Sequence, residues 1–206
     1  MLNLPTQLTL LRILLTPVFV SLLFLETVGF KIGSLIVFII ASLTDWYDGY
    51  FARKSGVITM WGQFLDPLAD KILVSSALIC FSILGYVQEY IVLIIIIRDL
   101  IITALRSYAV IQNQPFHTNF FAKTKTSGQI IAIYFIFIYY LFTWQMNISQ
   151  TQGLLGFIHQ AHIISIIMYL ITAVTLFSGV IYLIENRALI RKAFTNLFRI
   201  FVPTDI

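Results

Sequence analysis

The chain has 206 residues, of which 59% are apolar and 11% are charged, and its mean hydropathy is +0.93. Soluble domains carry about twice that share of charged residues, so the composition excludes a soluble enzyme or binding module and indicates an integral membrane protein. The formal net charge is +4, and we expect membrane lipid, and no nucleic acid, among its partners.

Six apolar runs follow one another along the chain, each close to the roughly 20 residues that a helix needs to cross a bilayer. They cover residues 5–25, 32–51, 68–87, 90–108, 127–144 and 161–184. The runs do not alternate apolar with polar at every second residue, which excludes the strands of a transmembrane barrel. No linker or internal repeat separates them. We therefore predict an all-α integral membrane protein with six transmembrane helices in one bundle, forming a single domain over residues 1–206.

Basic residues are distributed unevenly between the predicted loops. Those on one side are Arg53, Lys54 and Lys71 around the loop after the second run, Lys123 and Lys125 before the fifth, and Arg187, Arg191, Lys192 and Arg199 after the sixth. The loops of the other side hold almost nothing basic, only Lys31 with Glu26 beside it. Because short loops rich in Lys and Arg stay in the cytoplasm, we predict that both termini and a polar active-site cavity face the cytoplasm.

Four aspartates lie around the loop between the second and third runs. A carboxylate facing lipid costs about 2.5 to 3.5 kcal/mol, so these side chains must face something polar. Asp45 and Asp48 are three residues apart, and Asp66 and Asp70 are four apart, so each pair shares one side of a helix, with Pro67 expected in the first turn of the third helix. Facing one another, the pairs can hold one or two Mg²⁺ or Mn²⁺ ions. Two metals about 3.5 to 4 Å apart would clamp the attacking and leaving oxygens of a phosphoryl transfer.

Small and basic residues accompany the aspartates. Gly49, Ala52 and Arg53 follow Asp48, and Gly62 precedes Asp66. Glycine lets a nucleotide or pyrophosphate approach the backbone, and arginine can bind a phosphate through two hydrogen bonds. Each of these residues also has a structural interpretation, because Gly and Ala favour close helix packing and Arg53 suits the membrane interface.

The joint spacing Asp-x2-Asp-Gly-x2-Ala-Arg-x8-Gly-x3-Asp-x3-Asp resembles the signature of the CDP-alcohol phosphotransferase family at every fixed position. The resemblance implies six transmembrane helices with this motif on the second and third. It implies an enzyme that transfers a substituted phosphate from a CDP-linked donor to an alcohol and releases CMP. Carried over by residue, it implies metal ligands at Asp45, Asp48, Asp66 and Asp70, with Asp70 also the general base, and nucleotide or diphosphate contacts at Gly49, Ala52, Arg53 and Gly62.

The flanking sequence resembles the bacterial members of that family that use glycerol 3-phosphate as the acceptor. The similar segments are residues 3–12, residues 64–71, Arg98-Asp99 with Arg106, residues 123–126 and Ser178-Gly179, although Ala122 stands where related chains often have Gly. This resemblance implies CDP-diacylglycerol as the donor, phosphatidylglycerophosphate and CMP as products, a homodimer, and a bacterial cytoplasmic (inner) membrane.

Cations in and near the fourth run agree with a phosphorylated acceptor. Arg98 lies inside that run, and we expect its neighbour Asp99 to project in another direction, so that Arg98 needs an anion or a water-filled cavity. Arg106 lies eight residues later on roughly the same face, and Lys123 and Lys125 precede the fifth run. These four cations predict a pocket for the phosphate of glycerol 3-phosphate. In the alternative interpretation, Arg106 and the two lysines are interfacial anchors.

Two other functions remain open. A sister enzyme with another acceptor, such as a cardiolipin synthase or a phosphatidylinositol-phosphate synthase, would share every metal-site residue, so only the acceptor pocket discriminates. A divalent-cation transporter would also carry carboxylates in its membrane helices, but near the midplane between broken or repeated helices. The absence of an inverted repeat and the position of the aspartates at helix ends argue against a transporter.

Overall fold

The computed structural model describes residues 4–55, 60–112, 120–145, 162–187, 189–192 and 195, and within these it describes the backbone alone for residues 4–6, 45, 46, 48–55, 60–67, 70, 111, 120–125 and 145. All regular structure in the described residues is helical. The long helices are α1 (Leu4–Phe24), α2 (Val28–Ser55), α3 (Met60–Ile83), α4 (Glu89–Ile111), α5 (Phe120–Gln145) and α7 (Ile163–Glu185). Each predicted apolar run overlaps one of these helices, so an all-α protein is confirmed for the described residues.

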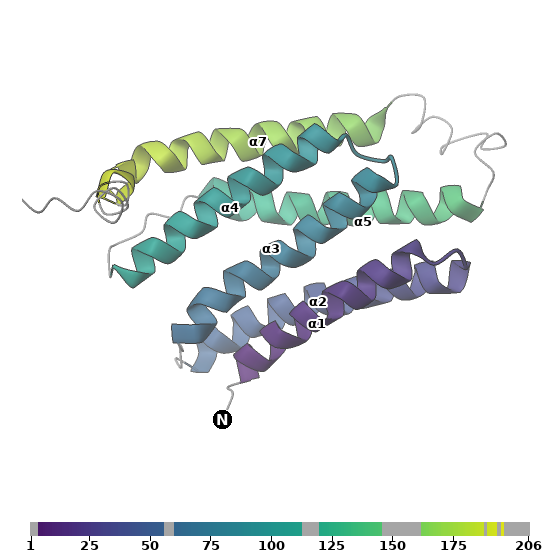
Figure 1. Ribbon diagram of the computed structural model, residues 1–206, viewed down its shortest axis with the longest axis horizontal. Coiled ribbons are helices and arrows are strands. Elements are labelled where there is room, and N and C mark those ends of the chain that lie inside the picture. Colours follow the sequence, from purple (N-terminus) through teal and green to yellow (C-terminus); the bar gives the residue numbers. More distant parts are fainter. Residues whose placement is uncertain are drawn as a thin grey trace, which may run out of the picture.

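Successive helices run in opposite directions through the bundle (Figure 1). The C-terminal ends of α2, α4 and α7 therefore lie at the same end of the molecule as the N-terminal ends of α1, α3 and α5 (Figure 1). We call this end, where α2 ends and α3 begins, the motif end. α1 packs on α2 and α3, α4 packs between α3 and α7, and α5 contacts α7, α2 and α3.

Three of the helices are long and apolar enough to cross a membrane, through Gln7–Phe24 of α1, Thr126–Trp144 of α5 and Ile163–Glu185 of α7. Shorter apolar stretches occupy Val28–Thr44 of α2 and Lys71–Ile83 of α3. α4 has 23 residues, but three charged residues interrupt its apolar sequence. Length and composition thus identify three candidate membrane spans within the described residues.

The described surface is apolar and the interior holds polar groups. Large apolar side chains are exposed on every long helix, among them Leu14, Ile36, Ile79, Leu93, Ile131 and Leu170, whereas polar side chains are buried, among them Thr9, Ser34, Asp99, Gln129, Thr172 and Ser178. A soluble protein rarely exposes apolar patches on this scale, and lipid has no means of solvating polar groups. The arrangement is that of an integral membrane protein.

Several helices extend beyond the predicted runs. α3 begins at Met60, so Pro67 lies inside this helix and not in its first turn. α5 begins at Phe120, so Lys123 and Lys125 lie on a helix and not in a loop. Lys31, also assigned to a loop, lies in α2 and is only 2% exposed. These corrections share one cause: hydropathy locates the apolar part of a helix, while the backbone hydrogen bonds continue beyond it.

Aromatic side chains fill the interior where α1, α2, α3 and α5 meet. Phe19 contacts Phe38 with ring centroids 5.4 Å apart, and Phe81 meets Phe137 edge to face at 5.3 Å. Apolar burial of this kind does little to drive helices together in lipid, so close packing of such rings holds the bundle through dispersion and ring geometry.

The turn after α3 has a defined end. Gly85 adopts a φ of +81°, which favours glycine, and it follows the last helical residues. The backbone N–H of Gly85 donates to the carbonyl of Ser82, and that of Tyr86 donates to the carbonyl of Phe81. This pair of bonds is a Schellman motif, and it reverses the chain toward α4.

Candidate active site

The two pairs of aspartates lie on the parts of α2 and α3 that continue past the apolar stretches. α2 runs through Asp45 and Asp48 to its end at Ser55, and α3 carries Asp66 and Asp70. Residues 56–59 separate the two helices, and both pairs lie in the halves of α2 and α3 nearer the motif end, inside the helices and not at their ends as predicted. Because the backbone is helical at both places, positions three and four residues apart stay on one side of each helix. The side chains of the four aspartates lie outside the described residues.

The other residues predicted for the nucleotide and the acceptor share this end of the bundle. Gly49, Ala52 and Arg53 lie on the last turns of α2, and Gly62 lies at the start of α3. Lys123 and Lys125 lie on the first turns of α5, whose N-terminal end is also at the motif end. The backbone alone is described for these residues, so their contacts stay predictions.

Arg98 is held between α4 and α7 by side chains on both helices. Its Nη1 donates to Oδ1 of Asp99 at 3.2 Å, and its Nη2 donates to Oγ of Ser178 at 2.8 Å. The Ser178 hydroxyl donates in turn to the carbonyl of Thr175 at 3.0 Å, so its oxygen is available as an acceptor for the guanidinium. Gly179 completes the contact, because a Cβ at this position would lie 3.0 Å from Arg98 Nε.

The expectation that Asp99 projects away from Arg98 is wrong. Neighbouring residues on a helix start in different directions, but the Arg98 side chain is long enough to return to the carboxylate beside it. Asp99 is only 4% exposed, and its second oxygen lies 3.8 Å from Nζ of Lys71 on α3. One buried carboxylate thus stands between two cations from two helices.

Tyr182 connects Arg98 with the next predicted acceptor residue. Its phenol is buried on α7, one turn beyond Ser178, and it lies within electrostatic range of both Arg98 and Arg106. Arg106 itself is exposed on α4. Arg98 therefore faces α7, and Arg106 lies near enough to act electrostatically on the same phenol. Sequence reasoning missed Tyr182, because a tyrosine in an apolar run gives no signal of a polar neighbour.

Arg12 is a buried cation that sequence reasoning did not single out. It lies in the first half of α1 and is 0% exposed, the largest fully buried side chain described. A signal was present, because an arginine inside an apolar run is expensive unless it faces an anion or another polar group. In the sequence analysis, Arg12 appears only as the last residue of the segment 3–12 that resembles related enzymes.

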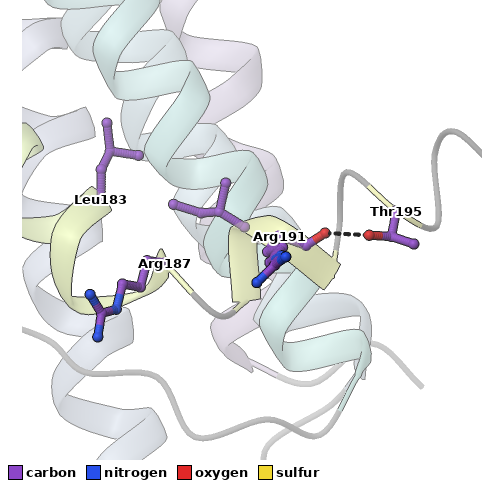
Figure 2. Close-up of a pocket in the computed structure, with 5 residues that line it drawn as sticks. Leu183, Arg187, Arg191 and Thr195 are labelled. Atoms are coloured by element: carbon purple, nitrogen blue, oxygen red, sulfur yellow. Dashed lines mark hydrogen bonds between the residues drawn. The ribbon is translucent and has the colours of Figure 1, made fainter.

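A cavity of about 590 Å³ lies at the C-terminal end of α7, lined by Leu183, Arg187, Ile190, Arg191 and Thr195. Figure 2 shows the two arginines on successive turns, with Thr195 Oγ1 donating to the carbonyl of Arg191 at 2.8 Å. Among the side chains that the structure describes, none of the predicted site residues lines this cavity. Its guanidinium groups beside apolar side chains suit the phosphate and acyl region of a lipid interface.

The donor chemistry of the motif end fits a divalent cation. Four aspartates on two consecutive helices provide hard oxygen donors, which Mg²⁺ and Mn²⁺ prefer. Among the side chains that the structure describes, no group of three or more His, Cys, Asp or Glu residues gathers elsewhere. The residues Asp45, Asp48, Asp66 and Asp70 remain the predicted ligands on the strength of their sequence pattern.

Comparison with known proteins identifies a matching family and similar relatives. The family model described as CDP-alcohol phosphatidyltransferase matches residues 2–177. A protein of Bacillus subtilis named CDP-diacylglycerol–glycerol-3-phosphate 3-phosphatidyltransferase is 41% identical over 145 residues, covering 65% of this chain and 75% of its own. A protein of the same name from Wigglesworthia glossinidia brevipalpis is 41% identical, covering 65% of this chain and 75% of its own. Another from Salmonella typhimurium is 34% identical, covering 71% of this chain and 79% of its own.

Proposed function

This chain belongs to the CDP-alcohol phosphatidyltransferase family, and on that basis we propose that it transfers the phosphatidyl group of CDP-diacylglycerol to glycerol 3-phosphate, giving phosphatidylglycerophosphate and CMP. The observation that carries the proposal is the family match over residues 2–177, which includes the complete aspartate signature. Relatives at 34% to 41% identity bear the name of this reaction. The protein is then a membrane enzyme of phospholipid biosynthesis.

The proposed metal site uses Asp45, Asp48, Asp66 and Asp70 to hold Mg²⁺ or Mn²⁺, as two ions. When bound, the ions supply Lewis-acid stabilisation of the charge that develops on the phosphate oxygens. Family membership supports a divalent metal, and the place of the four aspartates on the consecutive helices α2 and α3 supports these ligands.

The chemical step is a displacement at phosphorus with Asp70 as the general base. Asp70 accepts the proton of the primary hydroxyl of glycerol 3-phosphate, and that oxygen attacks the β-phosphorus of CDP-diacylglycerol. A new P–O bond to the acceptor forms while the bond from the β-phosphorus to the oxygen bridging the two phosphates breaks. CMP leaves with that oxygen.

The donor lies with its acyl chains in lipid and its cytidine diphosphate at the motif end. Gly49, Ala52, Arg53 and Gly62 are the proposed contacts for the nucleotide and diphosphate. Their helix segments adjoin the aspartates on both α2 and α3. Small residues would allow the nucleotide to approach the backbone, and the arginine would bind a phosphate.

The acceptor phosphate is proposed to bind among Arg98, Arg106, Lys123 and Lys125. The location of Tyr182 near both arginines supports a common pocket on the α7 side of α4. The position of α5's first turns at the motif end supports a contribution from the two lysines. Such a group of cations favours a phosphorylated alcohol over a neutral one.

We further propose that all six long helices cross the membrane and form one domain over residues 1–206. Both termini and the motif end would then lie in the cytoplasm of a bacterium. We also propose that the chain assembles as a homodimer. The basic residues near the motif end support this orientation. Arg187 and Arg191, beside the cavity of Figure 2, would lie at the cytoplasmic interface among lipid headgroups.

The test is CMP release by the purified protein in detergent with CDP-diacylglycerol and Mg²⁺ or Mn²⁺. Glycerol 3-phosphate is compared with phosphatidylglycerol, inositol phosphate, serine and no acceptor, and a chelator is added to a matched sample. Release that requires both glycerol 3-phosphate and metal supports the proposal. Release only with another acceptor would identify a sister enzyme, and no release with any acceptor would reopen the transporter alternative.

A further inference from the structure

Asp99 occupies the point at which α3 and α4 are joined by charged side chains. Its Oδ1 accepts a hydrogen bond from Arg98 at 3.2 Å, and its Oδ2 lies 3.8 Å from Lys71 Nζ. The Lys71 and Arg98 side chains are 16% and 13% exposed, and Asp99 is 4% exposed. At such burial, electrostatic attraction is stronger than at a solvated surface, and each partner depends on the others for its position.

One of the two cations lies beside the proposed general base, and the other belongs to the proposed acceptor pocket. Lys71 directly follows Asp70, the proposed general base, on α3. Arg98 belongs to the proposed acceptor pocket on α4. A carboxylate that holds both cations fixes the distance between the helix turn that carries the base and the helix turn that binds the acceptor.

α7 restrains the same group from the other side. Ser178 accepts from Arg98 Nη2 at 2.8 Å, and Gly179 leaves the space that the Arg98 side chain occupies. With Nη1 on Asp99 and Nη2 on Ser178, the guanidinium plane is set by two helices. A planar guanidinium that is bound on two edges has little freedom to reorient toward an acceptor phosphate in another position.

We propose that Asp99 is a positioning residue, which aligns the acceptor-binding Arg98 with the turn of α3 that carries Asp70. This inference rests on the proposed function. Asp99 touches neither substrate in this account and acts through Arg98 and Lys71. Loss of its charge leaves two cations facing each other and frees the hydrogen-bonding edge of Arg98.

The test compares Asp99→Asn, Asp99→Glu and wild type by CMP release, with kcat and both KM values determined. For Asp99→Asn we expect a fall in kcat of about 10- to 100-fold and a rise of about tenfold in KM for glycerol 3-phosphate, as for loss of other supporting contacts. KM for CDP-diacylglycerol stays unchanged, and Asp99→Glu recovers part of both losses because it keeps the charge. A merely structural role would lower the active fraction and leave both KM values unchanged, which would overturn the inference.

A double-mutant cycle tests the route through Lys71. Lys71→Met is expected to lower kcat in the wild-type background and to have little further effect in Asp99→Asn, since the pair is already broken. Independent, additive losses would contradict the bridge. Thr143→Val is the matched control, because it removes a buried hydroxyl bonded to the Tyr139 carbonyl in α5 and should leave both KM values unchanged.

The outcomes separate this inference from the proposed function. If wild type turns over glycerol 3-phosphate and Asp99→Asn matches it in kcat and acceptor KM, the positioning role fails alone. If wild type shows no turnover with any acceptor, the proposed function fails, and the positioning role fails with it.

Discussion

Lys31 of α2 donates a hydrogen bond from Nζ to the hydroxyl of Tyr140 on α5 over 2.6 Å, at the end of the bundle opposite the four aspartates. The same ammonium donates to the carbonyl of Leu23 near the end of α1 at 3.2 Å and lies 3.8 Å from the centre of the Trp144 ring. One buried cation therefore ties together α1, α2 and α5, and it does so far from the proposed chemistry.

Tyr140→Phe should lower stability without altering catalysis. The substitution keeps the ring in the aromatic interior but removes an acceptor from a buried ammonium, and hydrogen bonds to charged groups contribute about 1.5 to 3 kcal/mol. Thermal unfolding in detergent should show a lower midpoint, while kcat per folded molecule and both KM values stay at wild-type values. An unchanged midpoint would mean that Leu23 and Trp144 alone hold Lys31.

Gly179→Ala should weaken acceptor binding. The new methyl would lie 3.0 Å from Arg98 Nε and 3.3 Å from its Cγ, so the arginine must shift. We expect KM for glycerol 3-phosphate to rise by about tenfold, because small displacements of a binding group are costly, while the KM of the donor stays unchanged.

The matched control for this substitution is Gly33→Ala in α2. There the new methyl would meet only Leu22 Cδ1 at 3.9 Å, an ordinary contact. The control should gain up to about 1 kcal/mol of stability from helix propensity and keep wild-type kinetics. Equal acceptor KM values in the two glycine variants would refute the close contact between Gly179 and Arg98.

Asp70→Asn should abolish turnover and leave binding of CDP-diacylglycerol largely intact. The amide has nearly the shape of the carboxylate but cannot accept the proton of the acceptor hydroxyl. Equilibrium titration in detergent measures how tightly the variant binds the donor. This measurement separates the role as general base from the role in metal coordination. If binding falls as far as turnover, Asp70 is a metal ligand only.

Arg106→Ala should raise KM for glycerol 3-phosphate far more than KM for CDP-diacylglycerol. The substitution removes a cation from the proposed acceptor pocket and leaves the aspartate segments of α2 and α3 unchanged. Initial rates measured while each substrate is varied in turn provide both constants. An equal rise in the two values would argue that Arg106 is an interfacial anchor.

Sequence reasoning located the helices well and their ends poorly. Each apolar run overlaps a helix, but α2 continues to Ser55 and α5 begins at Phe120, beyond the apolar residues. The extra turns carry the polar residues of interest. Hydropathy reports where a helix contacts lipid, and the polar turns of the same helix leave no such mark.

The polar contacts show a second limit of sequence reasoning. The aspartate signature could be recognised because its spacing is local, within two adjacent helices. The bond from Arg98 to Ser178 joins residues 80 apart, and the approach of Lys71 to Asp99 depends on how α3 packs on α4. Neither contact can be predicted from sequence periodicity, because the packing of the helices determines which polar groups come together.

The central claim is tested most directly by supplying radiolabelled glycerol 3-phosphate with CDP-diacylglycerol and divalent metal, then measuring label in the lipid extract and CMP in the aqueous phase. We predict that label enters a lipid product in a one-to-one ratio with CMP, and that Asp70→Asn forms neither. CMP release without labelled lipid, or labelled lipid formed equally by Asp70→Asn, would contradict the account.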